Sequence, residues 1–281
     1  MRFPLFFCTA ALLATVCQGS VASPASAADA ELWRLDCGSI GVRDLSIFSD
    51  SFHYAGQSKT LTDSCYLIRH GDSYMLWDTG LPAELIGQTP DPAGLFAPSL
   101  DLSIADQLAE IAVRPEQIEL IGISHYHFDH LGQASAFPQA TLMIGAKDWE
   151  ALNADPLPFG ADAKQVQPWL DGGKVDPVAG DKDVFGDGSV TMLAMPGHTP
   201  GETALLVRLA ETGPVLLSGD VVHFHEQLPI EGVPAFNTDR ADSLASLDRL
   251  IDIAAELGAT LIIQHDVDDV AKLPAFPESA K

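Results

Sequence analysis

Basic residues are scarce in this chain. Its 281 residues include 15 Lys and Arg against 39 Asp and Glu, which gives a formal net charge of −24. Nucleic-acid binding depends on clustered Lys and Arg that displace counterions from phosphates, and no such cluster is visible in the sequence. The composition therefore argues against a nuclease and against nucleic acid as a partner, and the acidity is typical of a solubilising surface.

Long hydrophobic runs are absent after residue 27. Residues 1–27 contain one charged side chain, Arg2, followed by an apolar run over residues 3–16 and the small-x-small sequence of residues 25–27. The run is shorter than the ~20 residues that cross a bilayer, which favours a cleaved signal peptide over a membrane anchor. We therefore expect a periplasmic or secreted protein, free of the membrane after cleavage, with one domain over residues 28–281.

Cysteine is also rare. Cys8 and Cys17 would leave with the signal peptide, so the mature chain would keep Cys37 and Cys65. An oxidising compartment would permit a disulfide between these two, and two small buried thiols are an equally good account.

Strand and helix patterns alternate along the rest of the chain, which implies an α/β layered domain. Apolar segments at 66–68 and 74–77 flank a polar, Gly-containing turn and predict a β-hairpin. Further strands are expected at 119–123, 141–144, 190–194, 203–209, 215–218 and 260–263, and helices at 104–112, through Trp149 and at 244–257. Two segments rich in Pro, Gly and Asp, 81–102 and 153–180, are expected to be surface loops, and the second could overhang a site.

The densest group of possible metal ligands directly follows the strand expected at 119–123. His125, His127, Asp129 and His130 occur within six residues. In an extended segment alternate side chains share one side, and His130 joins the other three if the chain then turns into a helix. Imidazole and carboxylate suit zinc, and burying these groups together without a metal would be costly. The sequence therefore predicts a metal site with a ligand density suited to two ions.

Three further candidates lie near the ends of expected strands. His198 sits in the glycine-rich turn Pro-Gly-His-Thr-Pro-Gly, Asp220 follows an apolar strand, and His265 follows another. Taken singly these are weak signals, because a lone histidine is more often structural and Asp220 could simply cap a helix. Their value lies in the joint pattern.

The joint pattern resembles the metallo-β-lactamase superfamily, in which His-x-His-x-Asp-His is followed by a distant His, an Asp and a final His. Within it the chain is most similar to the N-acyl-homoserine lactonases, the quorum-quenching lactonases. The matching segments are 76–80, 124–130, 196–201, 215–220 and His265. The resemblance implies an αββα sandwich with two divalent ions, of which zinc is the expected metal, at one sheet edge.

The resemblance also implies a role for each candidate. The first ion would be held by His125, His127 and His198, the second by Asp129, His130 and His265, with Asp220 bridging them. Asp129 would also orient the attacking water and move its proton. The lactonases carry a tyrosine three residues after the bridging aspartate, where this chain has His223. His223 could donate a similar hydrogen bond, with His225 on the same side if the segment is extended; both could equally be exposed loop residues.

The resemblance favours a metal-dependent hydrolase that opens a lactone ring, with an N-acyl-homoserine lactone as its small-molecule substrate and a metal-bridging hydroxide as nucleophile. A periplasmic metallo-β-lactamase is the alternative, and another ester or thioester hydrolase is a third possibility. A non-catalytic metal-binding scaffold would not need an open water position. Tyr126, Phe128 and Phe224 are candidate pocket walls, and the two Pro-rich segments could form a groove for an acyl chain.

Overall fold

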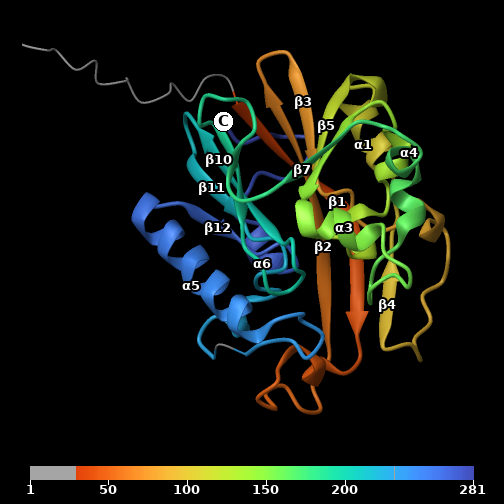
Figure 1. The fold of residues 1–281 in the computed structure, drawn as a ribbon, viewed down its shortest axis with the longest axis vertical. Helices are drawn as coiled ribbons and strands as arrows, with labels where there is room; N and C mark the ends of the chain where they lie inside the picture. Colours follow the sequence, from red (N-terminus) through yellow and green to blue (C-terminus); the bar gives the residue numbers. More distant parts are fainter. Residues whose placement is uncertain (1–29, 231) are drawn as a thin grey trace, which may run out of the picture.

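The computed structural model describes residues 30–230 and 232–281, so the predicted signal peptide lies outside the described residues. Two β-sheets pack face to face, and helices cover the outer face of each (Figure 1). This arrangement confirms the predicted αββα sandwich. Among the described residues, no helix has the length and hydropathy needed to cross a bilayer.

The first sheet has the strand order β4-β1-β2-β3-β5-β6-β7. Its strands are β1 (Ala30–Val42), β2 (Lys59–His70), β3 (Ser73–Trp77), β4 (Phe96–Ser99), β5 (Ile118–Ile123), β6 (Thr141–Gly145) and β7 (Val175–Val178). The second sheet has the order β12-β11-β10-β9-β8. Its strands are β8 (Lys182–Asp183), β9 (Val190–Ala194), β10 (Thr203–Leu209), β11 (Gly213–Leu217) and β12 (Thr260–Ile262).

The described residues form six α-helices, four of which cover the two outer faces. They are α1 (Ile104–Glu110), α2 (Phe128–Leu131), α3 (Ala146–Leu152), α4 (Gln167–Leu170), α5 (Arg240–Leu257) and α6 (Val267–Val270). Helices α1, α3 and α4 pack on the first sheet in one apolar cluster that also contains Leu67 and Leu76. Helix α5 packs on the second sheet through Leu247 and Leu250.

The core between the sheets follows the two-residue period of the strands. Tyr66 and Trp77 point inward from the first sheet and pack against Leu205 and Leu217 of the second. Their neighbours in sequence point outward to the helices, because successive strand side chains alternate between faces. The hydrophobic pattern therefore specifies which face of each strand enters the core.

Most local predictions are confirmed. β2 and β3 form the predicted hairpin, with Gly71 at positive φ in the turn. Helix α5 begins four residues earlier than the apolar period suggested, since the side chain of Asp239 accepts a hydrogen bond from the Asp242 amide and caps it. It ends at Gly258, in the left-handed conformation expected of a C-terminal cap.

The prediction that residues 81–102 form only a loop is wrong. Phe96–Ser99 forms β4, which pairs antiparallel with the end of β1 and places Phe96 opposite Val42. Pro98 made this segment resemble a loop, but β4 is an edge strand, where a residue without an amide hydrogen is tolerated. Residues 153–180 likewise include α4 and β7 as well as irregular chain.

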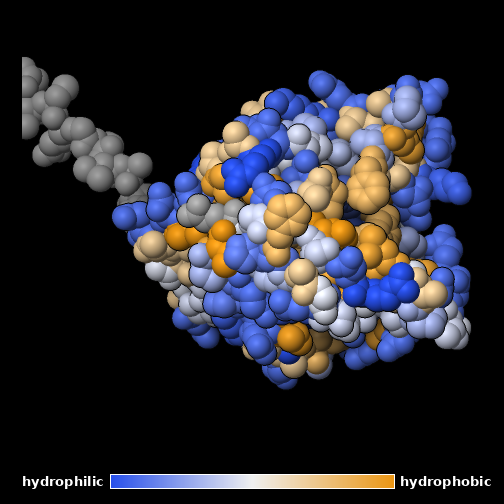
Figure 2. Space-filling model, turned by 90° about the horizontal axis from the view of Figure 1, so that it is seen from below, coloured by the Kyte–Doolittle hydropathy of each residue, from blue (hydrophilic) through white to orange (hydrophobic). Residues whose placement is uncertain are grey.

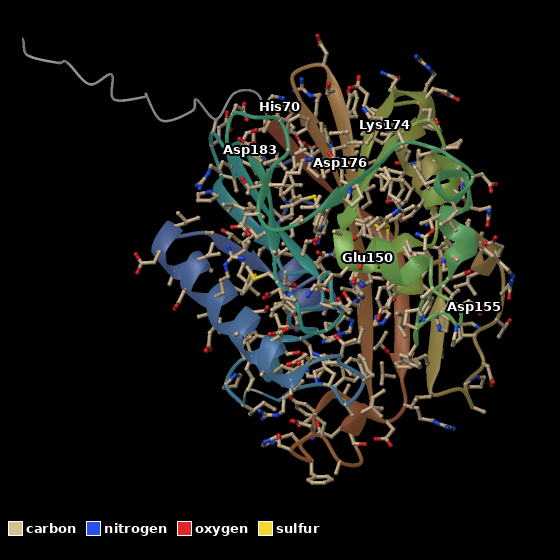
Figure 3. The ribbon with its side chains drawn as sticks, viewed as in Figure 1. His70, Glu150, Asp155, Lys174, Asp176 and Asp183 are labelled. Atoms are coloured by element: carbon tan, nitrogen blue, oxygen red, sulfur yellow. A yellow bond between two sulfur atoms is a disulfide. The ribbon has the colours of Figure 1, made fainter. Side chains whose placement is uncertain are left out.

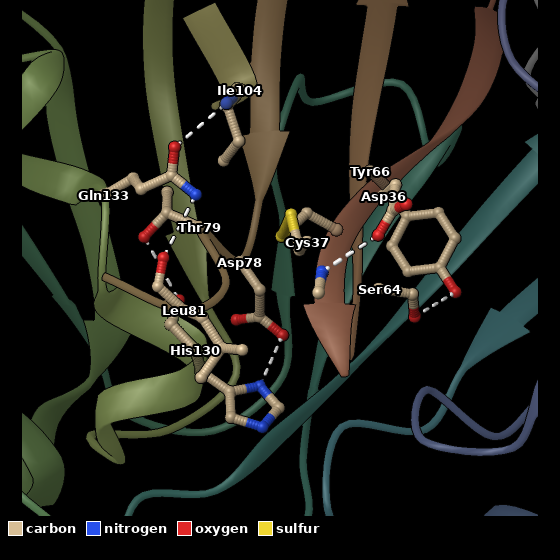
Figure 4. The surroundings of a disulfide bond; sticks show 12 residues. Asp36, Cys37, Ser64, Tyr66, Asp78, Thr79, Leu81, Ile104, His130 and Gln133 are labelled. Atoms are coloured by element: carbon tan, nitrogen blue, oxygen red, sulfur yellow. Dashed lines mark hydrogen bonds and ion pairs between the residues drawn. A yellow bond between two sulfur atoms is a disulfide. The ribbon is translucent and has the colours of Figure 1, made fainter. Parts of the chain in front are cut away.

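Cys37 and Cys65 form a disulfide between β1 and β2, so the sequence alternative of two free thiols is excluded (Figure 4). The bond packs against Gly80, which has φ +61°, and a Cβ there would lie 2.4 Å from the Cys37 Cβ. Only glycine fits at this point. The turn that follows β3 therefore lies directly on the disulfide and carries Asp78 toward His130.

Candidate metal centre

Strand ends from both sheets converge on one cluster of histidines and aspartates. β5 ends at Ile123 and leads into His125 and His127, and the chain then turns into α2, which carries Asp129 and His130. The β9–β10 turn carries His198, and Asp220 and His265 follow β11 and β12. All seven side chains are buried. The fold thus brings every predicted ligand to one edge of the sandwich.

One half of the cluster contains His125, His127, His198 and Asp220. The His127 Nδ1 lies 3.0 Å from the His125 Nε2 and 2.9 Å from the His198 Nε2. The Asp220 Oδ2 lies 3.7 Å from the His125 Nε2 and 3.5 Å from the His198 Nε2. Donors bound at ~2.0–2.1 Å in a tetrahedron lie about 3.3 Å apart, so this spacing fits a zinc-like ion.

The other half contains Asp129, His130 and His265. The His130 and His265 Nε2 atoms lie 3.2 Å apart, and the Asp220 Oδ1 lies 3.3 Å and 3.0 Å from them. The Asp129 Oδ2 is 3.9 Å from the His265 Nε2. The Asp220 Oδ1 is buried and has no hydrogen-bond partner. Asp220 therefore directs one oxygen at each half, as a carboxylate that bridges two ions would.

Burial and charge divide the imidazoles into two kinds. Burial lowers the pKa of His127 to about 4 and holds those of His125 and His198 well below the usual value. For His265 burial acts the same way, but the adjacent Asp220 carboxylate outweighs it and raises the pKa to about 9. Neutral imidazole is the form that binds a metal, so the first half of the cluster is suited to accept a cation.

The outer ring nitrogens of three ligands have partners of their own. The His130 Nδ1 donates to the Asp78 Oδ2 at 3.0 Å (Figure 4). The His198 Nδ1 donates to the Asn237 Oδ1 at 2.8 Å, and the His265 Nδ1 donates to the Thr62 carbonyl at 2.8 Å. Each bond places the proton on Nδ1 and directs the Nε2 lone pair into the cluster. Sequence analysis assigned no role to these partners. Asp78 lies in a segment that carried the resemblance, whereas Asn237 and Thr62 left no local signal.

His223 lies inside the cluster and His225 does not. The buried His223 places its Nε2 3.2 Å from the Asp220 Oδ2, and its Nδ1 has no hydrogen-bond partner. The His225 side chain is 66% exposed. The shared side was expected only for an extended segment, and the chain instead bends at residues 223–224 and enters a 3₁₀ turn (His225–Gln227).

A cavity of about 400 Å³ opens beside the cluster. Its apolar lining consists of Ile40, Phe48, Leu61, Leu95, Phe96, Phe128, Phe159 and Phe236. Figure 2 shows apolar side chains gathered around a hollow on the lower face of the molecule. Both Pro-rich segments contribute to this lining. Segment 81–102 supplies Leu95 and Phe96, and segment 153–180 supplies Phe159, which is consistent with the groove expected from them.

The predicted pocket walls are correct only in part. Phe128 lines the cavity, but Tyr126 and Phe224 do not. Phe224 is instead buried against Phe48, with their ring centroids 5.7 Å apart. Phe48 and Phe236 were missed, because they come from segments far from the histidine motif and only the tertiary fold brings them to it.

The histidine at the end of β2 belongs to a separate contact. His70, labelled in Figure 3, pairs with Asp187 at 2.8 Å and stacks on Phe185. No predicted metal ligand takes part in this contact.

The model of the Metallo-beta-lactamase superfamily matches residues 60–265. The chain belongs to this superfamily. An N-acyl homoserine lactonase, AttM, of Rhizobium radiobacter is 29% identical over 226 residues, covering 76% of this chain and 85% of the relative. An N-acyl homoserine lactonase of a Bacillus species is 28% identical over 221 residues, with the same coverage.

Solved structures of lactone hydrolases share this fold. An N-acyl homoserine lactone hydrolase with N-hexanoyl-L-homoserine at its catalytic metal centre superposes with a TM-score of 0.77 at 24% identity, covering 89% of this chain and 98% of that one. AidC, a dizinc quorum-quenching lactonase, gives a TM-score of 0.64 at 18% identity, with 90% of each chain covered. At these identities the likeness shows the fold.

Proposed function

We propose that this protein hydrolyses the ester bond of a lactone ring and that its substrate is an N-acyl homoserine lactone. The observation that carries the proposal is the position of Asp220, which directs one oxygen at each half of a His/Asp cluster beside an apolar cavity. The names of the relatives support the same reaction. The cavity suits an acyl chain, since each methylene buried there contributes about 0.8 kcal/mol.

Two divalent ions, which we propose to be zinc, would supply an activated water and polarise the substrate carbonyl. The chain's own groups then act around the carbonyl. The Asp129 carboxylate lies at the cavity wall, where it can take a proton from the water and deliver it to the alkoxide that leaves. His223 lines the cavity with its Nε2 facing the cluster, where its imidazole can donate a hydrogen bond to the substrate oxygen.

The cavity lining also separates the lactone from the β-lactam alternative. Among the described residues that line it, none is Lys or Arg. An acyl homoserine lactone is uncharged, whereas a β-lactam antibiotic carries a carboxylate, for which this lining supplies no basic side chain. The lining therefore favours the neutral, acylated substrate.

The deciding experiment is a parallel assay of the purified mature protein on acyl homoserine lactones of increasing chain length, an aryl ester and a chromogenic β-lactam. We expect kcat/KM for a medium- or long-chain lactone to exceed that for the β-lactam at least about tenfold, or ~1.4 kcal/mol in transition-state binding. Equal or faster β-lactam turnover would reverse the assignment.

We also propose that the protein acts outside the cytoplasm. The features of residues 1–27 and the Cys37–Cys65 disulfide support export, since disulfides persist in oxidising compartments. Cell fractionation with N-terminal sequencing should recover a mature chain that begins at Ala28 outside the cytoplasm. Recovery of the full-length chain in the cytoplasm would contradict this.

A further inference from the structure

Glu202 is a buried acid that the predicted site does not include. It follows the His198 turn, directly before β10, and its side chain is fully buried. Its Oε1 accepts a hydrogen bond of 2.9 Å from the backbone amide of Asp220. Its Oε2 is buried without a hydrogen-bond partner and lies 3.3 Å from the His125 Nδ1. Burying a carboxylate costs several kcal/mol unless other groups compensate it, so this placement calls for a reason.

The backbone around Glu202 leaves room for its carboxylate. Gly219 has φ +56°, and a Cβ at that position would lie 2.3 Å from the Glu202 Oε1. Any other residue would push the carboxylate away from the Asp220 amide. On the opposite side, the amide of Thr203 donates to the carbonyl of Ser124, which ties the start of β10 to the His125 segment.

A second group also approaches the outer nitrogen of His125. The Ser124 Oγ lies 3.1 Å from the His125 Nδ1, but it lies equally close to the His130 Nδ1. A neutral hydroxyl divided between two imidazoles is a weaker acceptor than a carboxylate. Glu202 therefore joins two members of the cluster that come from different sheets, the His125 imidazole and the backbone of Asp220.

We propose that Glu202 is a positioning residue of the metal centre. One oxygen holds the backbone of the bridging aspartate, while the other accepts the His125 Nδ1 proton and so directs the Nε2 lone pair at the first half of the cluster. The proposal rests on the metal centre of the proposed function but not on the identity of the substrate.

Glu202→Gln tests the role of the oxygen that faces His125. Its amide can still accept from Asp220, but its NH₂ group opposes the His125 Nδ1 proton. Titrating the metal-free protein with zinc against a chromogenic chelator should show the affinity of one ion reduced about 10–100-fold, with two ions still bound at saturation. Glu202→Ala loses the contacts with both the Asp220 amide and the His125 imidazole, so the affinity for both ions should fall.

Glu150→Gln is the matched control. Glu150, labelled in Figure 3, is exposed on α3 and is not one of the predicted ligands, so Glu150→Gln makes the same change of charge outside the cluster. Its zinc affinities should equal those of the wild type. A double-mutant cycle separates positioning from packing: in a His125→Ala background, Glu202→Gln should have little further effect, because its partner is gone.

Wild-type zinc affinities in Glu202→Gln would overturn the proposal. So would a loss that persists undiminished in the His125→Ala background together with a lower Tm of the metal-free protein, which would assign Glu202 to packing. These measurements use no substrate. If the wild type binds zinc but does not hydrolyse the lactones, the proposed substrate is wrong, and the role of Glu202 in zinc binding is unaffected.

Discussion

Replacing Asp220 by Ala should weaken the binding of both ions. Its Oδ2 lies 3.5 Å from the His198 Nε2 and its Oδ1 lies 3.0 Å from the His265 Nε2, so the substitution removes one donor from each half of the cluster. Losing a group that only supports a ligand costs 10–100-fold in affinity, so losing a direct donor should cost at least about 100-fold per ion, or ~2.7 kcal/mol. It also removes one of two carboxylate charges that offset the ions.

Elemental analysis after dialysis measures the number of zinc ions bound per chain. At free zinc tenfold above the wild-type Kd, the wild type should hold about 1.8 ions per chain, and a variant with hundredfold weaker sites about 0.2. Asp129→Ala is the control, because Asp129 belongs to one half only and its loss should spare the other ion. If Asp220→Ala loses one ion and keeps the other, Asp220 does not bridge the two halves of the cluster.

His223→Ala should lower kcat about 10–100-fold with metal content unchanged, as expected when a hydrogen bond to the transition state is lost, and unchanged kinetics would remove His223 from the mechanism. Replacing Cys37 and Cys65 by Ala opens a loop with a separation of 28 residues and should lower the free energy of unfolding by about 3.6 kcal/mol in denaturant titrations; a loss below about 1 kcal/mol would contradict this. Burial raises the pKa of Asp148 from 3.8 to about 7, so in the metal-free protein this carboxyl costs stability as pH rises from about 4 through 7. Asp148→Asn does not titrate there, so its stability relative to the wild type should improve across that window, and parallel stability curves would exclude the effect.

Local sequence determined much of the fold and the ligand set. The β2–β3 hairpin, the long helix α5 with its Gly258 cap and the strand that precedes His125 each follow from signals within about twenty residues. The spacing of His125 to His130 is a local property too, because one strand end and one short helix present all four side chains. Such features depend on backbone geometry and apolar period, which short segments already specify.

Tertiary structure decided the rest. Whether Cys37 meets Cys65, whether Pro98 belongs to a strand, and which aromatic rings line the cavity depend on segments that meet only when the sheets pack. Pairs such as Glu202 with His125 leave no periodic trace, since a single buried contact between distant residues has no local repeat. The sequence by itself thus specified most of the strands, the long helix α5 and the ligand types, while the packing of two sheets decided their partners, because long-range contacts are set by the fold as a whole.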